Sequence, residues 1–156
     1  MPNKDLNYTI LSDNIDKKLL SNFKEYHIIN DMPFDEVISL LENYLSKTII
    51  FNETFYNYKK SEIKKILSLL NTRHINFINI TSNIEETLLS DYIYVLNNGK
   101  VVIEGETKKV LEEEKILKHL GFGLPFVVDI SIQLKCYGVL DKIYYDMESL
   151  VNDLWN

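Results

Sequence analysis

The feature that most constrains the fold is an alternation of short apolar runs with segments whose apolar side chains recur at helical spacing. The apolar runs predict strands at residues 7–12, 47–52 and 75–81. Helical spacing predicts helices at residues 15–27, 33–45, 61–73 and 83–90. Strands that alternate with helices favour a mostly parallel sheet with helices on its faces. The sequence therefore predicts an α/β fold.

The last third of the chain is predicted to differ from the rest. Residues 92–97 and 100–104 resemble two strands joined by Asn98-Gly99, a dipeptide typical of a hairpin turn. Helical spacing then predicts helices at residues 108–120, 125–137 and 147–155. The glycines and proline of GFGLP at residues 121–125 predict a joint between them. We therefore expect an α/β core at residues 1–120, with the hairpin at the sheet edge, and a C-terminal helical subdomain at residues 121–156.

Composition and charge exclude several classes of function. The chain has 156 residues, enough for one domain, and a net charge of −6 with Arg73 as its only arginine, so a nucleic-acid partner is not expected. Cys136 is the only cysteine, which excludes an internal disulfide and a thiolate cluster. His27, His74 and His119 lie far apart, without metal-ligand spacing, so no metal site is expected. A polar start and the lack of a long apolar run predict a cytoplasmic protein.

Glycine is absent from the first 98 residues. A loop that cradles a phosphate needs glycine where the backbone adopts a positive φ and approaches the phosphate closely. The sequence therefore predicts no phosphate-binding loop in the first two thirds of the chain.

Four stretches in a fixed order carry a family resemblance. They are TIIFNET, INFINITSN, SDYIYVLNNGKVVIEGETKKVL and GFGLPFVVDISIQLK, all within residues 47–156. Their order and spacing resemble the second half of an ABC-transporter ATPase domain. The last stretch, with a final helix that begins at Asp146, is similar to the C-terminal extension of the energy-coupling-factor ATPases, which drive cobalt, nickel and vitamin uptake. The resemblance implies a fold like that of P-loop NTPases.

The resemblance also implies a nucleotide site whose parts have been replaced. The Walker B aspartate, which holds magnesium, falls on Asn52, and the catalytic glutamate falls on Glu53. The switch histidine that contacts the γ-phosphate falls on Ser82. Lys18 stands near the position of the phosphate-binding lysine, in a segment without the pattern GxxxxGK[ST]. About 35 residues separate the first predicted strand from TIIF, too few for the helical arm that carries the family's signature motif. These departures imply a truncated, degenerate relative that does not hydrolyse ATP and needs no cofactor.

The same resemblance assigns a partner surface to the C-terminal subdomain. In the related ATPases this extension brings two subunits together, and two or three short helices cannot cover all their own apolar side chains. The expected partner is a second copy of the chain or an intact ABC ATPase subunit, with membrane transporter subunits beyond it. The chain would then lie at the inner face of the membrane. The expected interface residues are Phe122, Phe126, Val127, Leu150 and Trp155.

Other interpretations stay open on the sequence alone. One is a residual ATP-binding subunit of an importer for metal ions or vitamins, with ATP and magnesium as cofactors. Another is a stand-alone scaffold or the remnant of a gene. Each candidate residue also has a purely structural interpretation: Glu53 as a solvated or capping carboxylate, Lys18 as a surface lysine, and Asn52 and Ser82 as polar groups at strand ends.

Overall fold

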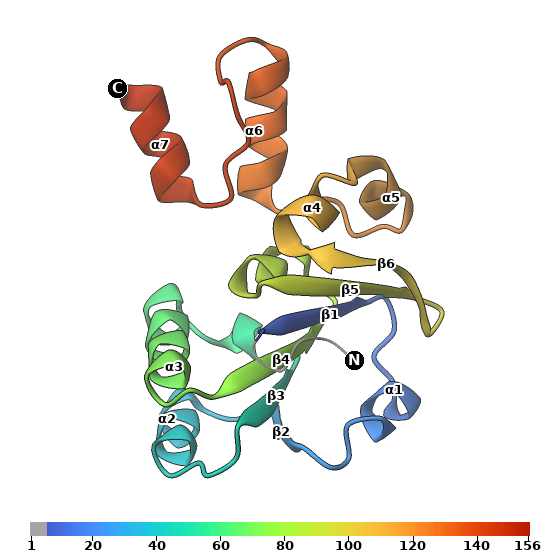
Figure 1. Cartoon of the computed structure of the whole chain (residues 1–156), viewed down its shortest axis with the longest axis vertical. Coiled ribbons are helices and arrows are strands. Elements are labelled where there is room, and N and C mark those ends of the chain that lie inside the picture. Colours follow the sequence, from blue (N-terminus) through green and yellow to red (C-terminus); the bar gives the residue numbers. More distant parts are fainter. Residues whose placement is uncertain (1–5) are drawn as a thin grey trace.

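A six-stranded sheet forms the centre of the protein, shown by a computed structural model that describes residues 6–156 (Figure 1). The strands are β1 (Tyr8–Ser12), β2 (His27–Asn30), β3 (Thr48–Asn52), β4 (Asn76–Thr81), β5 (Tyr92–Asn97) and β6 (Lys100–Glu106). Their order in the sheet is β2-β3-β4-β1-β5-β6. All neighbours are parallel except β5 and β6, which form the antiparallel pair at one edge. The predicted mostly parallel sheet with an edge hairpin is confirmed.

Seven α-helices and two 3-10 helices are described within residues 6–156. The α-helices are α1 (Lys17–Ser21), α2 (Phe34–Glu42), α3 (Lys60–Thr72), α4 (Thr107–Leu111), α5 (Glu114–His119), α6 (Phe126–Cys136) and α7 (Met147–Trp155). The 3-10 helices are η1 (Phe55–Asn57) and η2 (Ile84–Leu89). Across the described residues, every helix is too short or too polar to cross a membrane.

Three predicted helices differ from the structure. The helix expected at residues 15–27 is wrong in its second half, because α1 ends at Ser21 and residues 27–30 form strand β2. So short a segment shows no helical or strand period of its own, and pairing with β3 decides its conformation. The segment 83–90 forms the 3-10 helix η2, and the segment 108–120 is divided into α4 and α5.

The two faces of the sheet are covered unequally. On one face, α2 and α3 bury a cluster that contains Phe51 and Phe77, both almost completely excluded from solvent. On the other face, Leu19 and Leu20 of α1 and Phe23 of the turn after it pack against a smaller cluster around Ile50. The chain therefore leaves β1 toward the face covered by α1, whereas α2 and α3, which lead to β3 and β4, cover the opposite face. This divergence of the chain at the sheet edge locates the candidate site described below.

The C-terminal helices share a hydrophobic cluster with the sheet. Val127 and Val128 of α6 and Leu150 of α7 belong to the cluster that contains Leu11 of β1 and Val95 of β5. Figure 1 shows α6 and α7 beyond α4, at the end of the molecule opposite α2. The division into a core at 1–120 and a helical subdomain at 121–156 stays a prediction, and residues 1–5 of that core lie outside the described residues.

Candidate functional site

The candidate site lies at the carboxyl ends of the parallel strands. From β1 the chain passes to α1 on one face, and from the neighbouring β4 it passes to η2, whose Ile84 packs on the other face. Open α/β sheets bind ligands in the crevice where the loops of neighbouring strands diverge in this way. The residues that follow β1, β4 and the adjacent β3 therefore form the candidate site.

A short polar turn follows β1. The hydroxyl of Ser12 donates a hydrogen bond to the Asn14 carbonyl at 2.9 Å and accepts one from the Asn14 N–H at 3.3 Å. Asp16 then caps α1, because its carboxylate accepts a hydrogen bond from the Leu19 N–H at 2.8 Å. A helix start can bind an anion through such N–H groups, but here a carboxylate of the chain itself accepts from one of them.

Lys18 lies on the exposed surface of α1. Among the interactions described for residues 6–156, no hydrogen bond or ion pair joins the Lys18 ammonium to Asn52, Glu53 or Ser82. Within the described residues, the structure therefore shows no polar interaction between this candidate and the other three.

Asn52, at the end of β3, pairs with a residue that the sequence did not single out. Its Nδ2 donates a hydrogen bond to Oδ1 of Asn30, at 2.7 Å, and the two residues are in register on β3 and β2. The Thr54 hydroxyl ties the same two strands together through the Ile29 carbonyl at 3.0 Å. Asn30 was missed because no strand was predicted between the helix at 15–27 and the helix at 33–45. The apolar pair Ile28-Ile29 just before it was the available signal.

Glu53 contacts Ser82 across the site. The Ser82 hydroxyl donates a hydrogen bond to Oε1 of Glu53 at 2.9 Å, and both side chains are exposed. The backbone of Glu53 has a φ of 46°, in the left-handed region, and its N–H donates to the Ile80 carbonyl at 2.8 Å. A non-glycine residue in this region costs about 1–3 kcal/mol when it is held there. The turn after β3 therefore aims a carboxylate at the loop after β4.

Behind this edge lies a buried carboxyl group, that of Glu86 on η2. The residue is 6% exposed, and the Thr81 hydroxyl donates a hydrogen bond to its Oε2. Burial raises the pKa of the Glu86 carboxyl, the hydrogen bond from Thr81 opposes this rise, and the negative charge of Glu53 adds to it. Within the described residues, Oε1 of Glu86 and the side-chain amide of Asn79 have no hydrogen-bond partner. Glu86 is thus held as a neutral acid over part of the pH range in which free carboxyls ionise.

The sequence pattern at η2 pointed to a different role for Glu86. Asn83 and Glu86 resemble a capping box at a helix start. In the structure, Oδ1 of Asn83 accepts a hydrogen bond from the Glu85 N–H at 3.0 Å, whereas the Glu86 side chain turns inward to Thr81. The capping-box interpretation is correct for Asn83 and wrong for Glu86, because the 3-10 geometry moves the carboxyl toward the sheet.

Acidic and amide side chains dominate the site. Asp16, Asp31 and Glu53 follow three different strands at the same edge, and Asp31 also has a positive φ, of 34°. Across residues 6–156, no group of three or more histidine, cysteine, aspartate or glutamate side chains could hold a metal ion. The chemistry available at this edge is hydrogen bonding by amides and one carboxylate–hydroxyl pair.

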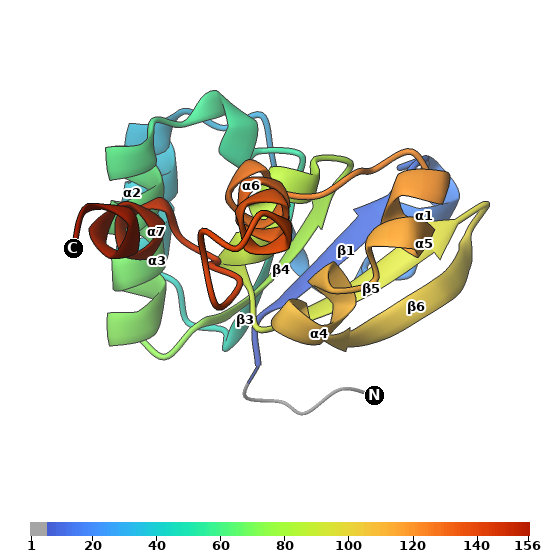
Figure 2. The ribbon, with the colours of Figure 1, turned by 90° about the horizontal axis from the view of Figure 1, so that it is seen from above.

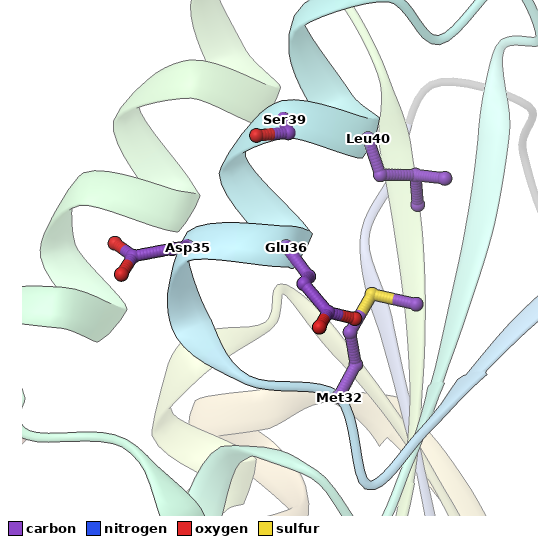
Figure 3. A pocket seen from close by; sticks show the side chains of 5 residues that line it. All are labelled: Met32, Asp35, Glu36, Ser39 and Leu40. Atoms are coloured by element: carbon purple, nitrogen blue, oxygen red, sulfur yellow. The ribbon is translucent and has the colours of Figure 1, made fainter.

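A separate hollow of about 490 Å³ lies on the outer surface of α2, lined by Met32, Asp35, Glu36, Ser39 and Leu40 (Figure 3). In Figure 3 the Asp35 side chain points away from that of Glu36, so the two carboxylates do not converge on one point. No cationic or nucleophilic group beyond the Ser39 hydroxyl lines this hollow. We assign no chemistry to it.

The expected interface residues differ in exposure. Phe126 is 59% exposed and Trp155 is 82% exposed, while Phe122 is half-buried. Val127 and Leu150 are buried in the chain's own core. Helix α7 instead offers an exposed apolar stripe for a partner, formed by side chains at positions i, i+4 and i+8: Met147, Val151 and Trp155.

Comparisons with known proteins find that this chain is similar in sequence to ATP-binding proteins of energy-coupling factor transporters. It is 35% identical over 94 residues to the energy-coupling factor transporter ATP-binding protein EcfA of Pediococcus pentosaceus, covering 58% of this chain and 33% of that protein. It is 31% identical over 98 residues to EcfA1 of Geobacillus kaustophilus, covering 62% and 35%. It is 33% identical over 97 residues to EcfA1 of Mesomycoplasma hyopneumoniae, covering 62% and 34%. The chain thus spans about one third of the length of these curated relatives.

No protein-family model matches the chain. Among solved structures, cbiO1 from Clostridium perfringens, part of the ABC transporter complex cbiONQ, has a TM-score of 0.48 at 14% identity over 84% of this chain and 88% of that chain. A bacterial Atm1-family ABC exporter with ATP bound has a TM-score of 0.42 at 21% identity over 48% and 14%. TM-scores below 0.5 are too low to transfer a site. The sequence relatives confirm the resemblance to the energy-coupling-factor ATPases.

Proposed function

We propose that this chain is a non-hydrolysing relative of the energy-coupling-factor ATP-binding subunits that acts by contact with another subunit. The observation that carries the proposal is the turn after β1, where the Asp16 carboxylate accepts the hydrogen bond of the Leu19 N–H at the start of α1. A nucleotide phosphate would have to displace this carboxylate and approach its negative charge. Residues 1–98 also contain no glycine, the residue whose missing side chain lets the backbone approach a phosphate closely.

The other side of the site supports the same proposal. Magnesium prefers carboxylate and water oxygens. Asn52 supplies an amide, whose Nδ2 already donates to Asn30. The Ser82 hydroxyl donates to Glu53 and so engages the carboxylate that would orient an attacking water. Phosphoryl transfer depends on positioned positive charge, and the side chains after β1, β2 and β3 bring Asp16, Asp31 and Glu53 instead. The residues present do not fit a magnesium–nucleotide group.

Contact with a partner subunit would use the outer side of the C-terminal helices. Trp155, Val151 and Met147 form an exposed stripe on α7, and Phe126 is exposed at the start of α6. Exposed aromatic side chains next to aliphatic ones are the usual anchors of protein interfaces. The partner would be a second copy of the chain or an intact ATPase subunit, and through it the chain would sit beside the membrane subunits of an importer on the cytoplasmic side.

The enzymatic part of the proposal is tested by phosphate release from ATP with magnesium, measured beside an active ATP-binding subunit of the same family. We expect no release above the background without protein and no micromolar ATP affinity by calorimetry. Steady release that Glu53→Gln abolishes would refute the proposal and favour a residual ATPase.

The interaction part is tested by light scattering at micromolar concentration. We expect twice the chain mass of 18.3 kDa, or a stable complex with an added ATPase subunit. Trp155→Ala should shift the distribution toward monomer, whereas Tyr56→Ala, which removes an aromatic side chain that is 67% exposed on η1, should not. A monomer that forms no complex with an energy-coupling-factor ATPase subunit would contradict the proposal.

A further inference from the structure

Three tyrosine rings and two carboxylates gather on the sheet face that α1 covers. Tyr8 of β1 is in register with Tyr92 of β5, which faces Glu106 of β6, and Tyr94 of β5 faces Glu104 of β6. Partners directly opposite each other in a sheet point to the same face. The ring centroids are 6.1 Å apart for Tyr8 and Tyr92, 6.2 Å for Tyr8 and Tyr94, and 5.2 Å for Tyr92 and Tyr94. We name these five residues the tyrosine surface.

The tyrosine surface is negative and accessible. The three tyrosines are half-buried, and Glu104 and Glu106 are exposed. Lys109 approaches Glu106 with 3.6 Å between Nζ and Oε2, but both side chains are largely exposed, so the pair is weak. Across residues 6–156, no ion pair joins Glu104 to a cation. Glu104 lies directly opposite Tyr94 in the register of β5 and β6. Burial raises the pKa of Tyr94, and the charge of Glu104 adds to this rise.

Such a surface attracts cations. The face of an aromatic ring carries negative potential, and a guanidinium or ammonium group over it gains about 0.5–2 kcal/mol depending on its exposure. A neighbouring carboxylate adds an ion pair and a charge-assisted hydrogen bond to the same group. The net charge of −6 favours a basic partner in general, and the tyrosine surface gives that charge a local site.

The strand that carries the carboxylates is also an open edge. β6 is the last strand of the sheet, and Figure 2 shows it along the outer border of the molecule, on the side away from α2 and α3. Its Val101 and Val102 are 53% and 48% exposed. The outer backbone groups of an edge strand can pair with an extended peptide, which lies about 4.8 Å away and places alternate side chains on each face.

We propose that β6 binds an extended segment of a partner protein that carries arginine or lysine at alternate positions. The segment adds a strand to β6, and its cationic side chains lie against Glu104 and Glu106 and reach toward the rings of Tyr92 and Tyr94. This surface is distinct from the outer stripe of α7. The proposal therefore does not depend on the one made above for the C-terminal helices.

The test uses the full chain and a synthetic probe, an acetylated and amidated peptide of sequence Thr-Arg-Thr-Arg-Thr. The control peptide has citrulline in place of arginine, which keeps the shape and removes the charge. Amide chemical shifts should change along β5 and β6 on titration with the arginine peptide. The arginine peptide should bind at least about tenfold more tightly than the citrulline peptide, since two cationic contacts are lost. Equal affinities, or shift changes confined to other elements, would overturn the proposal.

Variants separate the contribution of the carboxylates to peptide binding from that of the tyrosine rings. Glu104→Gln should weaken binding of the arginine peptide about fivefold or more, because it removes one charge at the surface without touching the core. Glu148→Gln, an exposed glutamate on α7, removes the same charge elsewhere and should leave the affinity unchanged. Tyr94→Phe should keep binding and Tyr94→Leu should reduce it. If Tyr94→Leu lowers the melting temperature sharply, Glu104→Gln alone decides the test. Unchanged affinity in Glu104→Gln would refute the proposal, as would self-association of the chain through β6 that excludes the peptide.

Discussion

Replacing the buried carboxyl of Glu86 by an amide should make the protein less sensitive to pH. The glutamine side chain of Glu86→Gln would have the shape of the neutral acid. Its Oε1 can accept the hydrogen bond of the Thr81 hydroxyl, and its NH₂ can turn to the Asn79 oxygen, which has no partner among the described residues. At low pH, where the wild-type carboxyl is protonated in both the folded and the unfolded chain, the two proteins should differ by no more than about 1 kcal/mol, the value of one hydrogen bond.

The difference should grow as the pH rises. The pKa of Glu86 is raised in the folded protein. Above the unfolded-state value of about 4.3 the unfolded chain loses its proton, whereas the folded chain keeps it until the pH reaches the folded pKa. The contribution of Glu86 to the free energy of unfolding therefore falls by up to about 1.4 kcal/mol per pH unit across this interval and then levels off. The amide does not titrate, so Glu86→Gln should become more stable than the wild type as the pH rises.

Thermal or urea unfolding from pH 4 to pH 8 measures this effect. For a chain of this size each kcal/mol corresponds to about 2–4 °C in melting temperature, which either method resolves. Glu25→Gln, which removes an exposed carboxylate with no described hydrogen bond, is the matched control for the loss of one negative charge. A difference between Glu86→Gln and the wild type that stays constant from pH 4 to pH 8 would refute the argument.

Three further substitutions test other parts of the fold by the same unfolding measurements. His74→Gly should raise the free energy of unfolding by about 0.5–1 kcal/mol. The exposed His74 follows α3 with a φ of 55°, a conformation that glycine adopts without strain. A loss of stability would contradict this prediction. Phe51→Ala should lower the free energy of unfolding by about 3–5 kcal/mol, because the ring is fully buried and its centroid lies 4.6 Å from that of Phe55. A decrease below about 1 kcal/mol would show that the cluster under α2 and α3 does not support the sheet. Asp146→Ala should cost about 1 kcal/mol at pH 7, because Oδ1 caps α7 through the Ser149 N–H at 2.8 Å. That hydrogen bond lowers the pKa of Asp146. The stability lost on substitution should therefore be largest above the unfolded pKa of about 3.9 and should shrink as the pH falls through the folded pKa. A loss of stability that does not depend on pH would count against the cap.

The candidate site shows where local pattern stops being informative. Asn52, Glu53 and Ser82 could be placed at one edge of the sheet from the sequence, because each follows an apolar run and the carboxyl ends of parallel strands meet at the same edge. Their roles stay predictions. The partners Asn30 and Glu86 could not be found in this way, since one depends on the short strand β2 and the other on the inward turn of a 3-10 helix.

The sequence by itself determined the α/β class and the hairpin at Asn98-Gly99, because continuous apolar runs, helical spacing and an Asn-Gly turn are local patterns of a few neighbouring residues. The resemblance to energy-coupling-factor ATPases was also visible in the sequence, because it is carried by stretches such as TIIFNET and INFINITSN. Only the tertiary structure decided that residues 27–30 extend the sheet, that Asp16 caps α1 and that Val127 and Leu150 are core rather than surface. It also decided that Tyr8 meets Tyr92 and Tyr94, which lie far from it in the sequence. Such contacts depend on strand pairing and helix packing between distant segments, whose energies no local pattern contains.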